Sequence, residues 1–269
     1  MNNFTKRLIF GALYVVLIVI ATTTNVYLFY GLFLVFMLFS IYEFQKMISL
    51  KSSIPTLLGL ILFFASFLNN TTHNGKVLFL LGLLVFFSSF ITTLLDKNKH
   101  AIIHLGKIAL TIAYTIIPFI LLIEIPFLDT LFNPILILGS FILVWTSDTF
   151  AYLIGRKFGK NKLFERISPN KTIEGFFGGV FFTVIVAYVL SVFFKEVSLF
   201  QWGIISIIIS IFGVLGDLIE SMFKRETKVK DSSSFIPGHG GFLDRLDSII
   251  FATPFLYVFI YITSNQNLF

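Results

Sequence analysis

Residues 201–219, QWGIISIIISIFGVLGDLI, and residues 249–264, IIFATPFLYVFIYITS, are apolar runs on either side of a long polar run. Apolar runs of about 15 to 20 residues are long enough to cross the hydrocarbon core of a bilayer as helices. The polar run, residues 221–247 (SMFKRETKVKDSSSFIPGHGGFLDRLD), is too charged to lie in that core. This stretch therefore predicts two transmembrane helices joined by a polar loop at a membrane surface.

The composition of the whole chain points to the same class of protein. Of its 269 residues 57% are hydrophobic and 13% are charged, and the mean hydropathy is +0.93. Soluble domains carry about 25% charged residues, so we predict an all-α polytopic integral membrane protein. Cysteine is absent, which excludes disulfides, a thiolate nucleophile and cysteine-ligated metals.

Apolar stretches recur along the entire chain and predict about nine transmembrane helices. Residues 1–24 combine a basic flank with an apolar run, as a signal peptide does. No Ala-x-Ala site follows and further apolar runs come directly after, which favours a first transmembrane helix. The nine predicted spans are residues 8–23, 26–43, 54–68, 77–95, 108–123, 134–154, 175–194, 201–219 and 249–264.

The distribution of basic residues predicts the orientation of these spans. If the N-terminus is cytoplasmic, eighteen of the twenty Lys and Arg residues fall on the cytoplasmic side, and only Lys76 and Lys195 fall outside. Cytoplasmic loops are rich in Lys and Arg, so we expect the N-terminus and the loops 155–174 and 220–248 in the cytoplasm and the C-terminus outside. We divide the chain into residues 1–134, which carry no recognisable motif, and a catalytic region, residues 135–269.

The polar run places cations beside carboxylates. Cationic side chains bind phosphate oxygens, and carboxylates bind Mg²⁺. The combination predicts an active site at the cytoplasmic membrane face for a metal-chelated, phosphate-rich ligand such as a nucleoside triphosphate. The side chains concerned are Lys224, Arg225, Lys228, Lys230, Arg245, Asp231, Asp244 and Asp247.

Two more acids lie near the cytoplasmic ends of predicted helices. An acid within a transmembrane helix costs about 2.5 to 3.5 kcal/mol, so Asp148 should face a protein interior or a watery cavity. A structural pair with Arg156 is the alternative. Asp217 shares one helix face with Glu220, Ser221 and Lys224, because these residues are spaced i, i+3, i+4 and i+7.

The acids predict a magnesium site. Mg²⁺ prefers one or two carboxylates together with phosphate oxygens and water. Asp217 and Asp244 come from the two helices that flank the polar loop, and we predict them as the metal-binding pair. Asp231 and Asp247 are then supporting groups or ligands of a second cation. The alternative for all these acids is a lattice of ion pairs with the nearby cations.

The Gly-rich part of the loop can approach a ligand closely. Pro237, Gly238, Gly240 and Gly241 allow backbone conformations whose bare amides cradle phosphate oxygens, although most such turns are merely turns. His239 lies among them. A phosphate monoester has a second pKa of about 6 and is already ionised at neutral pH, so no base is needed. We interpret His239 as a hydrogen-bonding or loop-ordering residue.

The polar run resembles the signature of the phosphatidate cytidylyltransferases, also called CDP-diacylglycerol synthases. The resemblance extends to SDTFAYLIGRKFGKNKL, ISPNKTIEG and GDLIES upstream, and so spans roughly Trp145 to Ser248. The fixed positions of the signature are filled by Ser221, Lys224, Arg225, Lys230, Asp231, Ser233, Ile236, Pro237, His239, Gly240, Gly241, Asp244, Arg245 and Asp247.

The resemblance implies an enzyme that condenses CTP with phosphatidate to CDP-diacylglycerol and diphosphate in phospholipid biosynthesis, with Mg²⁺ as cofactor. Lys171, within SPNKT, matches the family's motif and is our candidate for a specific contact with substrate phosphate. The candidate catalytic residues are Asp217, Asp244, Lys224, Arg225 and Asp231. The candidate substrate-binding residues are Asp148, Lys171, Ser221, Lys228, Lys230, His239, Gly240, Gly241 and Arg245.

We expect a multi-pass protein of a bacterial cytoplasmic membrane that acts on a membrane lipid, forms a homodimer and binds no nucleic acid. Two other functions fit parts of the sequence. A CTP-dependent polyprenol kinase would act on a lipid alcohol and would need a base. A transporter of an anionic solute would place its site at the bilayer midplane between repeated halves, and neither feature is visible.

Overall fold

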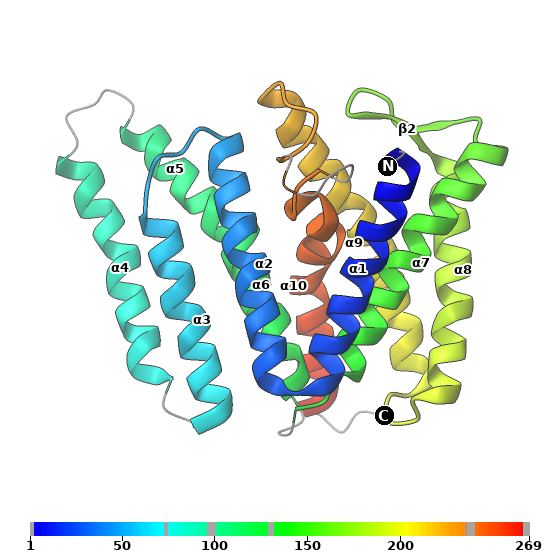
Figure 1. Cartoon of the computed structure of the whole chain (residues 1–269), viewed down its shortest axis with the longest axis horizontal. Helices are drawn as coiled ribbons and strands as arrows, with labels where there is room; N and C mark the ends of the chain where they lie inside the picture. The colour runs from blue at the N-terminus through cyan, green and yellow to red at the C-terminus, as the bar shows by residue number, and fades with distance from the viewer. Residues whose placement is uncertain are drawn as a thin grey trace. The chain divides into compact units, whose positions relative to one another are not determined.

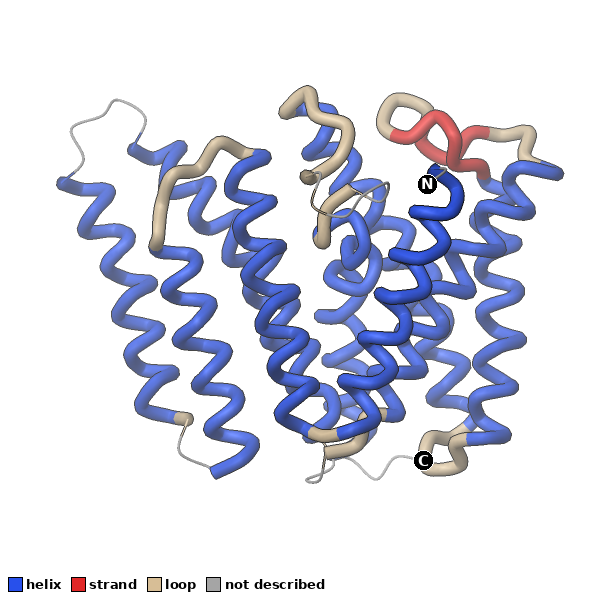
Figure 2. Tube along the Cα trace, in the orientation of Figure 1, coloured by secondary structure: helices blue, strands red, loops and turns tan. Residues whose placement is uncertain are grey.

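The computed structural model of the chain describes residues 3–72, 75–95, 101–128, 132–233, 235 and 240–265. Almost all regular structure in these ranges is helical, and strands are confined to one short hairpin (Figure 2). The prediction of an all-α polytopic membrane fold is confirmed. The helices are α1 (Asn3–Thr24), α2 (Val26–Met47), α3 (Ile54–Thr72), α4 (Lys76–Leu95), α5 (Ala101–Thr111), η1 (Ile112–Ile116), α6 (Ile117–Glu124), η2 (Ile125–Phe127), α7 (Ile135–Phe158), α8 (Ile173–Phe193), α9 (Leu199–Glu226) and α10 (Leu243–Asn265).

Each predicted apolar span lies within a helical stretch of the structure, except that the spans 134–154 and 175–194 each extend one residue beyond α7 and α8. The span predicted at residues 108–123 lies in a continuous helical stretch in which α5 and α6 are joined by the π-turn η1. Seven helical stretches within the described residues are long and apolar enough to cross a membrane, and the apolar parts of α1 and α4 are shorter. The exact number of spans and the orientation of the termini stay predictions.

The chain forms two compact units. Unit 1 contains Met1–Glu124 and Asp231–Leu243, and unit 2 contains Ile125–Lys230 and Asp244–Phe269. The polar run therefore contributes to both: its middle part belongs with the N-terminal helices, and its two ends belong with α9 and α10. The division at residue 134 stays a prediction.

The core of unit 1 is built around α2. Asn25 caps this helix, accepting a hydrogen bond from the Leu28 amide at 2.9 Å. Phe29 and Phe33 are fully buried, and their ring centroids lie 4.7 Å apart. In the same unit, α3 and α4 pack side by side (Figure 1). The buried rings of Phe29 and Phe33 place α2 in the core of unit 1.

Close helix packing in unit 2 depends on glycine. A β-carbon at Gly175 on α8 would lie 2.6 Å from the Ala151 carbonyl oxygen on α7, so no larger residue fits. A β-carbon at Gly216 on α9 would lie 2.5 Å from the Asp247 carbonyl oxygen on α10. The second contact agrees with the small residues expected where transmembrane helices approach closely. It also brings the polar ends of α9 and α10 together.

The basic loop between α7 and α8 contains an antiparallel hairpin of β1 (Lys162–Phe164) and β2 (Ser168–Thr172), with Lys162 opposite Thr172. Thr172 ends the hairpin and caps α8, since its hydroxyl accepts a hydrogen bond from the Gly175 amide. The Glu174 carboxylate accepts the backbone amides of Lys160 and Asn161 at 3.0 and 3.1 Å. These bonds fix the hairpin, and with it Lys171, against the ends of α7 and α8.

Candidate active site

A cavity of about 610 Å³ lies in unit 2 among α7, β2, α8, α9 and α10. It is lined by residues from all four sequence segments that carry the resemblance, so the structure brings these segments together. The polar residues that line it are Asp148, Tyr152, Arg156, Ser168, Asn170, Lys171, Thr172, Asp217, Asp244, Arg245, Asp247 and Ser248.

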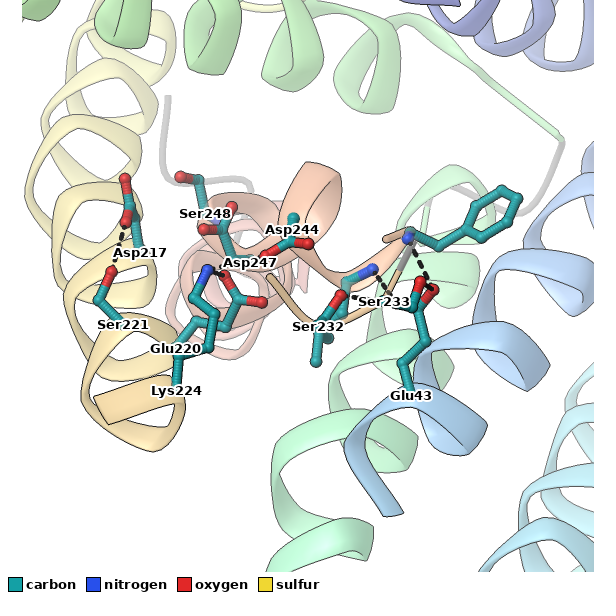
Figure 3. Close-up of polar contacts among 12 residues, drawn as sticks. Glu43, Asp217, Glu220, Ser221, Lys224, Ser232, Ser233, Asp244, Asp247 and Ser248 are labelled. Carbon is teal, nitrogen blue, oxygen red and sulfur yellow. Dashed lines mark hydrogen bonds and ion pairs between the residues drawn. The ribbon is translucent and has the colours of Figure 1, made fainter. Parts of the chain in front are cut away.

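Lys171 and Asp217 form an ion pair across the cavity, with 2.7 Å between the lysine nitrogen and the carboxylate. Their side chains are 24% and 35% exposed. Ser221 lies one helical turn after Asp217 and donates its hydroxyl to the same carboxylate at 3.2 Å (Figure 3). The common helix face predicted for these two residues is therefore present. Both groups of the ion pair remain open to a ligand that enters the cavity.

Lys224 joins two carboxylates. Its ammonium lies 2.8 Å from Glu220, on the preceding turn of α9, and 2.8 Å from Asp244, at the start of α10 (Figure 3). The Lys224 side chain is 13% exposed, that of Asp244 is 8% exposed and that of Glu220 is fully buried. Only one Glu220 oxygen has a hydrogen-bond partner within the described residues. This buried group ties α9 to α10.

The remaining two acids of the cavity differ in exposure. Asp148 is exposed and lines the cavity. Asp247 is buried, and one of its oxygens accepts the Ser248 amide at 2.7 Å. The proposed partner of Asp148, Arg156, instead donates to the Tyr152 hydroxyl at 3.4 Å. The structure therefore favours Asp148 as a residue of the cavity wall over Asp148 as the ion-pair partner of Arg156.

The donor set suits a hard divalent cation that is shared with a phosphate ligand. Four carboxylates line the cavity, and oxygen ligands of this type are those Mg²⁺ prefers. No group of three acids or histidines within the described residues is close enough to enclose a metal alone. The arrangement thus fits a cation held by one or two carboxylates, with further oxygens supplied by the ligand. The ion pairs of Lys171 and Lys224 also match the alternative of an ion-pair lattice.

Several candidate residues of the signature lie outside this cavity's lining. Arg225, Lys228 and Lys230 are exposed, and Arg225 donates to the Ile167 carbonyl at 3.4 Å. Their roles stay predictions. Asp231, Gly240 and Gly241 belong to unit 1, where Asp231 is exposed. Gly240 has a φ of 82°, the left-handed conformation that glycine tolerates best. His239, Pro237 and Gly238 lie outside the described residues.

The cavity also contains residues that the sequence did not single out. Ser168 and Asn170 precede Lys171 on β2, Tyr152 lies on α7 with Asp148, and Ser248 follows Asp247 on α10. Asn170 stood within the quoted ISPNKTIEG motif, so a signal for it existed. Tyr152 likewise stood within the quoted SDTFAYLIGRKFGKNKL, whereas Ser248 only follows the signature and the fold alone places it in the cavity.

Helices of membrane-spanning length around a cavity lined by acidic and basic side chains define a polytopic membrane protein with a charged cavity. The sequence matches the profile of the cytidylyltransferase family over residues 5–263, almost its full length. The chain belongs to this family.

Curated relatives agree with this assignment. The chain is 44% identical over 169 residues to a protein of Staphylococcus saprophyticus named phosphatidate cytidylyltransferase. It is 41% identical over 169 residues to a protein of that name from Staphylococcus epidermidis, and 42% identical over 171 residues to one from Staphylococcus aureus. Each match covers 62% of this chain and 64% of the relative, somewhat less than two thirds of its length.

Proposed function

We propose that the protein is a phosphatidate cytidylyltransferase, which converts CTP and phosphatidate into CDP-diacylglycerol and diphosphate. The observation that carries the proposal is the meeting of the motif segments in one cavity, where Lys171 contacts Asp217 and where Asp244, the ion-pair partner of Lys224, also lies. The names of the Staphylococcus relatives and the cytidylyltransferase family support the choice of nucleotide and lipid.

The cations of the cavity are suited to hold the triphosphate. Lys171 is partly exposed and already lies beside a carboxylate, so a phosphate oxygen can replace or share that carboxylate as its partner. Asp217 is then available for a metal, and Asp244 has the same relation to Lys224. The chemistry that a bound Mg²⁺ supplies is neutralisation of the triphosphate charge that grows as the bond to diphosphate breaks.

The reaction can proceed in a single displacement at the α-phosphorus of CTP. A phosphate oxygen of phosphatidate forms a bond to the α-phosphorus of CTP, and the bond from that phosphorus to the bridging oxygen of the β-phosphate breaks. Diphosphate leaves with the bridging oxygen. The attacking phosphate is already ionised, since its second pKa is about 6, so no side chain has to remove a proton.

No covalent nucleotidyl-enzyme is needed for this route, because holding both substrates in line supplies what a covalent step would add. CTP made chiral at the α-phosphorus by sulfur substitution should give product with inverted configuration. Retention of configuration, or exchange of diphosphate into CTP without lipid, would require a covalent intermediate.

We further propose that the cavity opens to the cytoplasm of a bacterial cell, where CTP is found, and that the enzyme works as a homodimer without nucleic acid. The cavity lies among helices of membrane-spanning length, which would let a lipid headgroup reach it from the bilayer. In the topology predicted from the distribution of Lys and Arg, the β1–β2 hairpin, the C-terminal end of α9 and the N-terminal end of α10 lie on the cytoplasmic side.

The direct test incubates the purified protein with cytidine-labelled CTP and phosphatidate in mixed micelles. We expect a lipid-soluble cytidine product that requires both substrates and Mg²⁺. A polyprenol kinase would leave the cytidine label in water-soluble CDP and would phosphorylate a lipid alcohol. An anionic-solute transporter would form no product, and either result would contradict the proposal.

A further inference from the structure

Glu43 is a completely buried acid near the C-terminal end of α2, in unit 1. Within the described residues its carboxylate accepts four hydrogen bonds, and their donors all come from the polar segment Asp231–Leu243 of the same unit (Figure 3). One oxygen accepts the Ser233 hydroxyl at 2.6 Å and the Phe242 amide at 3.1 Å. The other accepts the Ser232 hydroxyl and the Leu243 amide, both at 2.9 Å. One side chain thus binds both ends of this segment.

The chain is shaped to allow this contact. A β-carbon at Gly241 would collide with the Ser232 hydroxyl and with a Glu43 oxygen, so a larger residue at this position would force these two side chains to move. The rings of Phe39 and Phe242 stack with centroids 4.6 Å apart, and Phe235 packs edge-on against Phe39 at 5.3 Å. The segment therefore rests on a face of α2 whose polar centre is Glu43 and whose rim is aromatic.

The burial of Glu43 depends on its hydrogen-bond donors. Burying a carboxylate is costly unless its oxygens are hydrogen-bonded, and all four partners here are donors, which suits a group that only accepts. Hydrogen bonds to a charged acceptor are roughly twice as strong as neutral ones. An acid in a membrane-spanning helix is retained where it has a role.

The Leu243 amide is the link to the active site. Leu243 is the first residue of α10, and its amide is one of those that the helix itself cannot satisfy. A carboxylate at this end of a helix is also favoured by the helix dipole. The next residue, Asp244, lines the cavity of unit 2 and forms an ion pair with Lys224. Fixing the Leu243 backbone therefore fixes the point from which the Asp244 side chain projects.

We propose that Glu43 is a positioning residue for cytidylyl transfer: it holds the segment from Ser232 to Leu243 and thereby sets the first turn of α10, which carries Asp244. The inference rests on the proposed function. It gives the N-terminal helices, which carry no motif, a defined part in the reaction.

Glu43→Gln is the sharpest perturbation, because the side chain keeps its shape while one oxygen becomes an NH₂ group. In either orientation of the side-chain amide, the NH₂ group faces one backbone amide, that of Leu243 or that of Phe242, and cannot accept from it. Glu124→Gln is the matched control. Glu124 is in the same unit and accepts the Ser66 hydroxyl at 2.5 Å and the Asn70 amide at 3.0 Å, but it has no bond to the polar segment within the described residues.

Two measurements separate positioning from stability. The first is hydrogen exchange, by mass spectrometry, of the peptide that covers residues 240–247. The second is steady-state kinetics at varied CTP and phosphatidate. Displacing a reacting group by about 1 Å can cost about 100-fold in rate, so Glu43→Gln should lower kcat by about that factor. The KM values for CTP and phosphatidate should change far less, because Glu43 does not itself bind either substrate. Exchange at Phe242 and Leu243 should accelerate, and Glu124→Gln should change neither quantity.

Each other outcome counts against the proposal. Unchanged exchange would mean that Glu43 does not hold the segment, and faster exchange with unchanged kcat would mean that holding it does not matter to the reaction. An equal loss of kcat in both variants would indicate a general structural effect. If Glu43→Gln does not accumulate in the membrane, Ser233→Ala removes one of the four donors, and an unchanged kcat there would overturn the proposal. If the wild-type protein showed no cytidylyl transfer, the proposed function would be wrong. Hydrogen exchange would still test whether Glu43 holds the segment.

Discussion

Two lysines that form ion pairs of nearly equal length should respond very differently to the same substitution. Lys171 lies 2.7 Å from Asp217 and Lys224 lies 2.8 Å from Asp244. The first pair is 24% and 35% exposed, so its carboxylate can be hydrated when the lysine is lost. Lys171→Met should therefore change the free energy of unfolding by no more than about 1 kcal/mol, the range of exposed ion pairs.

Lys224→Met should be much more damaging to the fold. It leaves Glu220, which is fully buried, and Asp244, which is 8% exposed, without their shared cation. Removing one partner of a buried pair costs about 3 to 5 kcal/mol, because the remaining charge stays in a poorly solvated place. Both variants should lose cytidylyl transfer, because Lys171 is the proposed contact with substrate phosphate and Lys224 holds the proposed metal ligand Asp244.

The assay is reversible unfolding by sodium dodecyl sulfate in mixed micelles, with helicity followed by circular dichroism, alongside turnover of the folded fraction. We expect Lys171→Met to unfold close to the wild-type midpoint and Lys224→Met to unfold well below it. Equal stability losses in the two variants would refute the reasoning from burial. Full activity of Lys171→Met would show that Lys171 does not bind substrate phosphate.

Three further outcomes follow from the same structure. Cysteine introduced by Lys230→Cys and by Asn267→Cys should label from opposite sides of the membrane, and labelling from one side would contradict the nine-span topology. Asp217→Asn and Asp244→Asn should abolish turnover in protein that remains inserted, whereas more than about a tenth of wild-type activity at saturating Mg²⁺ would mean that the acid only supports the site. Gly216→Ala should destabilise the protein by about 1 to 3 kcal/mol, because the added methyl group meets the α10 backbone; an unchanged unfolding midpoint would argue against that close contact.

The sequence predicts the helices well because apolar runs of membrane-spanning length leave few other structures. It also places Asp217 and Ser221 on one face, since the helical repeat determines that relation and the structure has their hydrogen bond. The pairing of Lys171 with Asp217 could not be predicted in this way. It depends on how the hairpin after α7 returns to the cavity, and the short strands of that hairpin show no clear alternation in the sequence.

Glu43 shows the same limit more clearly. A single acid at the end of an apolar run was visible, but its partners lie 189 to 200 residues further along the chain. Two of them are backbone amides, which carry no side-chain signal. Local patterns cannot identify such contacts, because their geometry is determined by tertiary packing.

The position of the transferred phosphorus tests the central claim most directly. Purified protein is incubated with phosphatidate and CTP that carries the radioactive label in either the α- or the γ-phosphate. Direct cytidylyl transfer predicts that the α-label enters the lipid product and that the γ-label is recovered in diphosphate, in equal amounts. Appearance of the γ-label in lipid, or of neither label, would contradict the account.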